Sequence, residues 1–288
     1  MARVGEKLKM FEVLKRSLAG AMMVMITVWA TVSVSQDGPP DIGAITKQGY
    51  LVIAMLGTDN APFFSVKDGQ LVGIDVDLAK SIAAAMGVQP RFDRSAKSFD
   101  DVIEMVRTGQ ADIAVSKLNR TSEREKVVAF SNPYVTLRHA LLFNRLGLAE
   151  KAQGLDLGDY VRDFHGTLGV IEKSAYETFA KINFPNAKIV SLKDWRAVVD
   201  ATLSGTIDAA YRDEFAIRSV ALDRPETSID LRAITISDVR GAISVAVPWN
   251  KPMLLAIVNQ VIDDRPSKMN ADDVMNLYRT NISTTGEH

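Results

Sequence analysis

The chain carries an internal repeat of a helix followed by a strand, and this repeat restricts the possible folds more than any other feature. Residues 99–114 align without gaps on residues 195–210. Both segments begin with an aromatic residue, Phe99 or Trp195, continue with aliphatic residues at helical spacing, and carry a Gly and an Asp at matching positions. Self-similarity of this kind predicts two halves of like α/β structure.

Short apolar strands alternate with amphipathic helices along the rest of the chain, which is the pattern of an α/β fold. We expect a strand at Tyr50 to Met55 and a helix at Ile74 to Met86. A second helix, Phe99 to Arg107, leads into a strand at Ala111 to Ser116. With 288 residues, of which 47% are hydrophobic, the chain can build one large or two modest domains.

A charged residue follows the repeat strand in each half. Lys117 in the first half corresponds to Asp213 in the second. In open α/β sheets, ligands bind beyond the carboxyl ends of the strands. Two lobes that face each other would therefore present both residues to one cleft. A simpler role for Asp213 is also open, as the N-cap of a helix from Glu214 to Ala221.

Arg124 lies in the first turn of a short expected helix. Thr121 or Ser122 can cap this helix, and Ser122-x-x-Glu125 fits a capping box. A cation at this end opposes the helix dipole unless an anion is shared between the guanidinium and the free N–H groups. The forked guanidinium suits a carboxylate. The alternative is a surface arginine that Glu123 and Glu125 neutralise.

The N-terminus has the organisation of an export signal. Basic residues precede Leu18 to Val34, an uncharged run of 17 residues, and a polar segment follows. Ser33 and Ser35 suit the small-residue positions of a cleavage site, so we expect residues 1–35 to be a signal peptide. The alternative is an uncleaved anchor, because 17 helical residues fall only just short of a hydrocarbon core of about 30 Å.

The composition argues against several classes of function. The net charge is −1 and the basic residues beyond the N-terminus are scattered, which disfavours nucleic-acid binding. The absence of cysteine excludes disulfides, thiol catalysis and a lipid-modified cysteine. The three histidines, His139, His165 and His288, lack the spacing of metal ligands. We therefore expect neither a metal site nor a cofactor.

Several short motifs occur in a characteristic order. They are Gly57-Thr58-Asp59, Ala61-Pro62-Phe63, Leu71-Val72-Gly73-Ile74-Asp75-Val76-Asp77-Leu78-Ala79, Thr121-x-x-Arg124, Phe130-Ser131-x-Pro133-Tyr134 and Ile207-Asp208-Ala209-Ala210-Tyr211-Arg212-Asp213. With these motifs the sequence resembles the amino-acid-binding family of bacterial ABC-transporter solute-binding proteins. The resemblance extends from about Gly49 to Tyr278.

The resemblance implies an α/β fold of the two-lobed periplasmic-binding-protein type (type II). Each lobe is then a mixed sheet flanked by helices. Two crossover strands, near Leu137 to Phe143 and Ala233 to Ile243, would form a hinge. Lobe 1 would comprise residues 44–138 and 240–288, and lobe 2 residues 139–239.

The resemblance also implies roles for individual residues. Arg124 would bind the α-carboxylate of an amino acid and Asp213 its α-ammonium, while Phe99 would pack on the ligand and Ser174 would contact the carboxylate. The full set of expected ligand-binding residues is Asp59, Phe63, Phe99, Ser116, Lys117, Asn119, Arg124, Ser174 and Asp213.

The sequence departs from the family pattern at two places. Lys117 stands where a small residue such as Ser is common, and Lys173-Ser174-Ala175 replaces Gly-Ser/Thr-Thr. A lysine in the cleft can meet a side-chain carboxylate of the ligand, which would favour an acidic or otherwise polar amino acid. It can instead pair with Asp59 or Glu172. The sequence leaves both alternatives open.

By this resemblance we expect the periplasmic solute-binding component of an amino-acid ABC transporter. It would be a monomer that closes over its ligand and docks on a membrane permease. One alternative is an enzyme on the same architecture, resembling cyclohexadienyl dehydratases, with Glu172, Glu214 and Lys117 as candidate acids and bases. Another is a ligand-sensing domain.

Overall fold

The computed structural model describes residues 40–265 and 268–283. The expected signal peptide, residues 1–35, lies outside these ranges. Within them, no helix combines the length and the apolar character that a membrane crossing requires.

The first lobe is built on a mixed five-stranded sheet with the order β4-β1-β5-β12-β6. Its central part is parallel, since β1 pairs with β4 and β5, whereas β12 runs antiparallel to β5 and β6. The strands are β1 (Tyr50–Leu56), β4 (Gln89–Ala96), β5 (Ile113–Ala114), β6 (Ala129–Phe130) and β12 (Ala246–Val247). The helices are α2 (Pro40–Gln48), α3 (Ile74–Ala85), α4 (Phe99–Arg107), α5 (Ser122–Glu125) and α11 (Pro252–Asp263).

The second lobe is a mixed five-stranded sheet with the order β11-β7-β10-β8-β9. The strands are β7 (Val135–Asn144), β8 (Thr167–Ile171), β9 (Lys188–Leu192), β10 (Ala209–Asp213) and β11 (Leu231–Ile243). The helices are α6 (Arg145–Lys151), α7 (Leu157–Arg162), α8 (Ala175–Asn183), α9 (Trp195–Leu203), α10 (Glu214–Asp223) and the short 3₁₀ helix η2 (Pro225–Ser228). These two mixed α/β sheets confirm the predicted fold class.

The sheet of the second lobe has a separate apolar core on each face. Leu141 and Phe143 of β7 belong to one core, and Ala140 and Leu142 to the other. This division follows from the alternation of side chains along a strand. Because both faces of this sheet are covered, a charged side chain at the end of β10 is buried whichever face of the sheet it points to.

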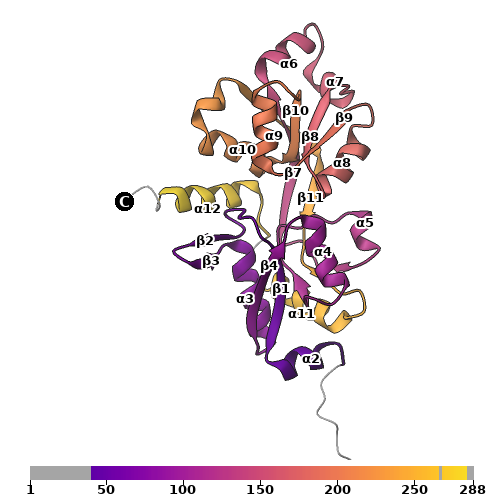
Figure 1. Cartoon of the computed structure of the whole chain (residues 1–288), viewed down its shortest axis with the longest axis vertical. Helices are drawn as coiled ribbons and strands as arrows, with labels where there is room; N and C mark the ends of the chain where they lie inside the picture. Colours follow the sequence, from indigo (N-terminus) through magenta and orange to yellow (C-terminus); the bar gives the residue numbers. More distant parts are fainter. Residues whose placement is uncertain (1–39, 266–267, 284–288) are drawn as a thin grey trace, which may run out of the picture. The chain divides into compact units, whose positions relative to one another are not determined.

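Two long strands connect the lobes, as Figure 1 shows for β7 and β11. They pair antiparallel from Leu231 opposite Asn144 to Ile243 opposite Val135, with one irregularity of register between Ile236 and Arg240. The predicted crossover segments lie within these two strands. A two-stranded connection of this kind permits lobe movement while it keeps the lobes in register.

The two copies of the sequence repeat form equivalent elements. Helices α4 and α9 each have nine residues and each begins after a residue whose side chain caps the helix, Ser98 or Asp194. The strand that follows α4 is shorter than predicted, because β5 pairs with its neighbours only at Ile113 and Ala114.

The last described helix, α12 (Ala271–Ser283), contacts the second lobe. Arg218 of α10 pairs with Asp272 at 2.8 Å, and the rings of Phe215 and Tyr278 are 5.4 Å apart. Figure 1 shows α12 beside α10. The boundaries proposed from sequence place residues 240–288 in lobe 1. They stay a prediction, because this helix bridges both lobes and the crossover strands are continuous.

A close backbone approach fixes the start of α3. The N–H groups of Ile74 and Asp75 donate to the carbonyl oxygens of Pro62 and Phe63 at 3.0 and 2.9 Å. Gly73, which precedes the helix, has a φ of +130° and leaves no room for a Cβ, since such an atom would lie 2.3 Å from the Phe63 oxygen. This contact holds the Phe63 segment against the helix that carries Asp75.

Candidate functional site

A small cavity lies between the two lobes, at the ends of β5 and β10. Its volume is about 20 Å³, enough for roughly one water molecule. Its walls include six of the residues expected from sequence, namely Phe99, Lys117, Asn119, Arg124, Ser174 and Asp213. Five further residues complete the wall: Ile171, Ala175, Tyr176, Tyr211 and Arg212.

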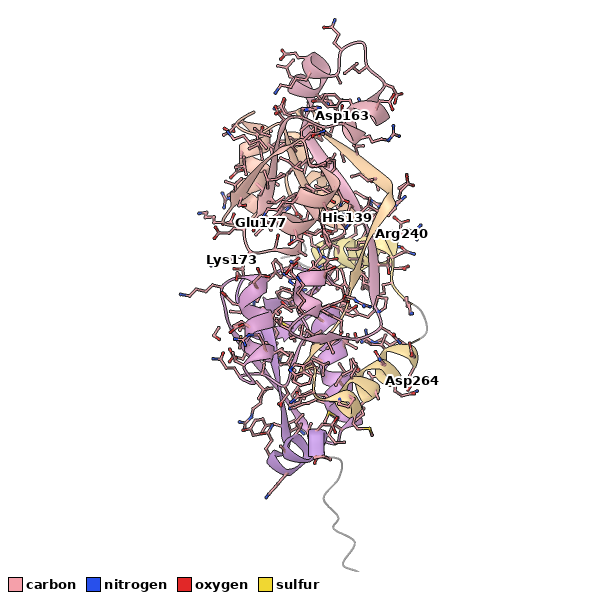
Figure 2. All side chains as sticks on the ribbon, turned by 90° about the vertical axis from the view of Figure 1, so that its right-hand side faces the viewer. His139, Asp163, Lys173, Glu177, Arg240 and Asp264 are labelled. Carbon is pink, nitrogen blue, oxygen red and sulfur yellow. The ribbon has the colours of Figure 1, made fainter. Side chains whose placement is uncertain are left out.

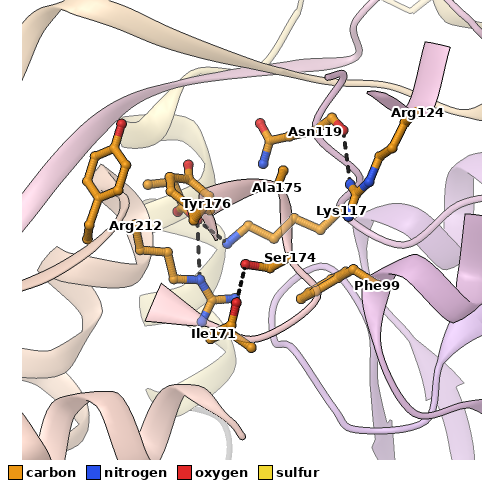
Figure 3. Close-up of a pocket in the computed structure, with 11 residues that line it drawn as sticks. Phe99, Lys117, Asn119, Arg124, Ile171, Ser174, Ala175, Tyr176 and Arg212 are labelled. Carbon is orange, nitrogen blue, oxygen red and sulfur yellow. Dashed lines mark hydrogen bonds and ion pairs between the residues drawn. The ribbon is translucent and has the colours of Figure 1, made fainter. Parts of the chain in front are cut away.

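Lys117 reaches across the cavity from the first lobe to the second. Its Nζ lies 2.9 Å from Oδ2 of Asp213, as an ion pair in which no N–H bond is well aligned with the oxygen. The ammonium also lies over two aromatic rings, 4.7 Å from the centroid of Phe63 and 5.2 Å from that of Phe215. Figure 3 shows this side chain extending across the site. Burial lowers the pKa of Lys117 to about 8, against the opposing attraction of Asp213.

The backbone at Lys117 is in the left-handed region, with a φ of +48°. This conformation is uncommon outside Gly, Asn and Asp and occurs where the surrounding structure holds it. Here the N–H group of Lys117 donates to Oδ2 of Asp75 at 2.6 Å. The pairing of Lys117 with Asp59 or Glu172 that the sequence left open is wrong, because the turn directs the side chain across the cleft to Asp213.

Asp213 is the N-cap considered from sequence and also lies in the cavity wall. Its Oδ1 accepts the N–H of Ala216 at 2.9 Å, which caps α10, and its Oδ2 faces Lys117. Burial would raise the pKa of Asp213, but the charges of Lys117 and Arg212 and the N–H of Ala216 lower it below the usual value. The side chain is therefore a buried carboxylate whose two oxygens are both occupied.

Arg124 is buried at the first-lobe side of the cavity. Its Nη2 donates to Oδ1 of Asp100 at 2.9 Å and its Nη1 to the carbonyl oxygen of Asn119 at 3.1 Å. The N–H of Arg124 donates to the Thr121 side chain, the N-cap of α5. Burial lowers the pKa of Arg124, although Asp100 opposes the shift.

The alternative of a surface arginine neutralised by its neighbours is wrong. Glu123 pairs with Lys126 at 2.8 Å and Glu125 with Arg120 at 2.6 Å. These three- and five-residue spacings bring side chains together on the outer surface, whereas Arg124 points inward.

Arg212 is a charged residue of the cavity wall that sequence reasoning missed. Its side chain is 9% exposed, and its Nε lies 3.7 Å from Oδ2 of Asp213. The guanidinium carbon is 5.0 Å from the centroid of the Trp195 ring. No hydrogen bond joins the guanidinium to another residue in the described part of the chain. The available signal was an arginine directly before Asp213, at the end of the apolar run Ala209 to Tyr211.

Two other polar atoms at the cavity also lack hydrogen-bond partners among the described residues. They are Oδ1 of Asn119 and the hydroxyl of Tyr176. Ser174, in contrast, donates from its Oγ to the carbonyl oxygen of Ile171 at 2.6 Å. The hydroxyl of Tyr176 is thus an unpaired polar group of a residue in the cavity wall, whereas Oδ1 of Asn119 lies against Gly241 of β11.

Three residues expected at the site lie outside the cavity wall. Asp59 is half exposed and pairs with Arg94 at 2.7 Å. The Oγ of Ser116 accepts the N–H of Leu56 at 3.0 Å within the sheet. Phe63 lies behind Lys117, where its ring faces the ammonium. None of these three side chains lines the cavity.

Lys173, the other departure from the family pattern, lies at the boundary between the lobes in Figure 2. It also has a left-handed backbone, with a φ of +52°, and its N–H donates to Glu177 at 3.0 Å. The residue is exposed and does not line the cavity.

Asp75 lies beneath the site as a fully buried carboxyl group. It accepts the hydroxyl of Tyr134 at 2.8 Å as well as the N–H of Lys117. Burial raises the pKa of Asp75 to about 7, although these hydrogen bonds and the charges of Lys117 and Arg265 oppose the shift. Between pH 3.8 and about 7, the folded protein therefore holds a proton on Asp75 that the unfolded chain releases.

We expect Asp75→Asn to change the pH dependence of stability. A raised carboxyl pKa contributes stability that is full below pH 3.8 and is lost as the pH rises to about 7. The free energy of unfolding of the variant, relative to wild type, should rise by up to about 1.4 kcal/mol per pH unit across that window. Urea unfolding at pH 5, 6 and 7 measures it.

The variant has to be compared with wild type at each pH, because the contribution of His139 to stability changes with pH in the opposite direction. Burial lowers the pKa of His139 to about 4, so its contribution to stability is lost as the pH falls from 6.5 to 4. In the pH dependence of wild-type stability alone, the contributions of Asp75 and His139 would partly cancel. A constant difference between Asp75→Asn and wild type would show that Asp75 is ionised throughout.

The sequence matches the model of the bacterial extracellular solute-binding proteins, family 3, over residues 51–278. A probable histidine-binding protein of Campylobacter jejuni is 26% identical over 219 residues, which cover 75% of this chain and 80% of that protein. A membrane-bound lytic murein transglycosylase F of Idiomarina loihiensis is 25% identical over 232 residues, 77% of this chain. The match spans only 48% of the transglycosylase.

Solved structures of amino-acid-binding proteins also resemble this chain. An amino acid ABC transporter substrate-binding protein, AbpA of Streptococcus pneumoniae bound to L-arginine, superposes with a TM-score of 0.66 at 29% identity. The superposition covers 85% of this chain and 99% of AbpA. An ancestral amino-acid-binding protein, a precursor of cyclohexadienyl dehydratase, has a TM-score of 0.64 at 25% identity, covering 83% and 97% of the two chains. With a matched family model over most of its length, this chain belongs to the bacterial extracellular solute-binding proteins, family 3.

Proposed function

We propose that the protein is the solute-binding component of an ABC transporter for amino acids or closely related small carboxylates. The observation that carries the proposal is the cavity between the lobes, whose buried charges come from both sides, Arg124 from one lobe and Arg212 and Asp213 from the other. Relatives that bind histidine or arginine support it.

The small size of the cavity implies that a solute is bound by closure of the lobes. At about 20 Å³ it is too small for an amino acid, so a solute has to enter while the lobes are further apart. Contacts to both lobes then stabilise the closed form relative to the open form. Arg124, with its N–H groups at the cavity wall, is the proposed anchor for the carboxylate of the solute.

We further propose that the protein works outside the cytoplasm, in the periplasm, after cleavage near residue 35. The permease of the transporter would be its partner and would recognise the closed lobes. N-terminal sequencing of the exported protein tests the cleavage: a mature chain that still begins near Met1 would refute it.

Three observations favour binding over catalysis. Glu214, a candidate acid or base, is buried against Arg138, with its Oε2 2.8 Å from Nη2 of that arginine. Glu172 is exposed and does not belong to the cavity wall. Asp213 is the one acidic residue of that wall, and Lys117 and the cap of α10 occupy its oxygens.

A thermal-shift screen tests the proposed function. We expect at least one amino acid or small carboxylate to raise the midpoint of unfolding by roughly 5 to 11 °C at a concentration of 100 Kd. Saturation to that level stabilises the native state by about 2.7 kcal/mol, and each kcal/mol shifts a protein of this size by about 2 to 4 °C. Failure of every amino acid, opine, polyamine and dicarboxylate to shift the midpoint would refute the proposal.

A further inference from the structure

The charges that line the cavity do not balance. Three cationic side chains, Lys117, Arg124 and Arg212, face it together with one carboxylate, Asp213. Asp100, which pairs with Arg124 from outside, has a side chain that is 54% exposed. Asp75 contacts the backbone N–H of Lys117, not its ammonium. Among the side chains that line the cavity, even with Asp100 counted, positive charge is in excess.

The carboxylate of Asp213 has no place for a further cation. One oxygen caps α10, and the other faces the ammonium of Lys117 at 2.9 Å and Nε of Arg212 at 3.7 Å. An ammonium group on a solute would add another buried positive charge beside Asp213, and no carboxylate oxygen there is free to pair with it. Such an unpaired charge is costly in a desolvated site.

The two arginines have unused donors and belong to different lobes. Arg124 uses three of its five N–H groups, on Asp100 and Asn119. The guanidinium of Arg212 makes no hydrogen bond within the described part of the chain, and the ring of Trp195 supports its planar group. In Figure 3 the two guanidinium groups approach the cavity from opposite sides. Planar guanidinium forks bind carboxylates in two-point contacts.

We infer that the solute of this protein is a short dicarboxylate without an ammonium group, with one carboxylate on Arg124 and the other on Arg212. Lys117 takes the place on Asp213 that an amino-acid ammonium would need, and so excludes amino acids by charge. This inference rests on the proposed function, because it names the solute class of the same cavity.

Calorimetry with matched pairs of solutes tests the inference on the wild-type protein. Succinate differs from aspartate, and glutarate from glutamate, by the ammonium group alone. We expect at least one dicarboxylate to bind ten or more times as tightly as its amino-acid counterpart, and arginine and histidine to show no binding. Aspartate or glutamate binding as tightly as its counterpart, or phosphate binding more tightly than either dicarboxylate, would overturn it.

Variants test which residues cause the affinity for dicarboxylates and the preference for them over amino acids. Arg212→Met should weaken dicarboxylate binding at least 30-fold, whereas Arg196→Met, at an exposed arginine next to Trp195, should leave it within twofold. Lys117→Asn should lower the preference for succinate over aspartate at least tenfold, because Asp213 then becomes free for an ammonium. Asn tolerates the left-handed backbone of residue 117.

The matched control for Lys117 is Lys173→Asn, which removes an exposed lysine from another left-handed position. It should leave the preference unchanged. Lys117→Met, which keeps the length of the side chain without its charge, should weaken succinate binding. Unchanged affinities in both Lys117 variants would refute the role of the ammonium.

The results separate the inference from the proposed function. Binding of amino acids in preference to dicarboxylates refutes the inference and leaves the solute-binding function intact. Failure of all these solutes to bind, together with no response in the wider thermal-shift screen, refutes both.

Discussion

Replacement of Arg124 by alanine is expected to raise the dissociation constant for the transported solute by a factor of about 30 to several thousand. The reason is that the carboxylate of the solute would be buried in the closed cleft without its partner, which typically costs about 2 to 5 kcal/mol. Calorimetric titration of wild type and variant with the solute found in the thermal-shift screen measures the effect.

Arg120→Ala is the matched control for this experiment. Arg120 is a partly exposed arginine four positions earlier, and it pairs with Glu125 on the surface. Its loss should change the affinity by less than about twofold, since exposed ion pairs contribute little. The Arg124 variant should also remain folded, because Asp100 is half exposed and stays hydrated. Equal affinities of wild type and Arg124→Ala would remove Arg124 from the site.

Replacement of Gly73 by alanine is expected to reduce the free energy of unfolding by about 4 kcal/mol or more. The added Cβ would lie 2.3 Å from the oxygen and 2.7 Å from the carbon of the Phe63 carbonyl group, and 2.7 Å from the Pro62 oxygen. Backbone atoms cannot move aside without loss of the hydrogen bonds from Ile74 and Asp75 to these carbonyl groups. Losses this large arise from few mechanisms, and backbone overlap is one. Urea unfolding measures it.

Gly69→Ala separates the overlap from the effect of a left-handed backbone. Gly69, in the turn between β2 (Ser65–Lys67) and β3 (Gln70–Val72), has a φ of +73° and no atom within 4 Å of the position of a Cβ. Alanine there should cost only about 1 to 2 kcal/mol. Similar costs at both positions would contradict the close approach at Gly73.

The elements that sequence predicted best are those with local signals. The helix at residues 99–107 was predicted with the bounds it has, because its apolar spacing and the glycine that follows it are contained in one short segment. The strand after it was predicted too long. Its end depends on neighbours from distant parts of the chain, since β5 pairs only where β1 and β12 are opposite.

The site could be predicted in part for the same reason. Lys117 and Asp213 were found through the repeat, which marks the carboxyl end of each strand. Their contact with each other was not, because it forms only when two lobes with distant sequences close together. Arg212 was passed over because its importance depends on Trp195, which lies at the start of another helix and supports the guanidinium.

The contact of Lys117 with Asp213 has a consequence for transport kinetics. It joins the lobes through protein atoms alone, so this contact between the lobes needs no solute to bridge it. A permease that recognises closed lobes would then also dock empty binding protein, which would compete with the loaded form for the same surface. At a fixed solute concentration, uptake would level off below the capacity of the permease as the amount of binding protein increases, and Lys117→Asn would raise that plateau.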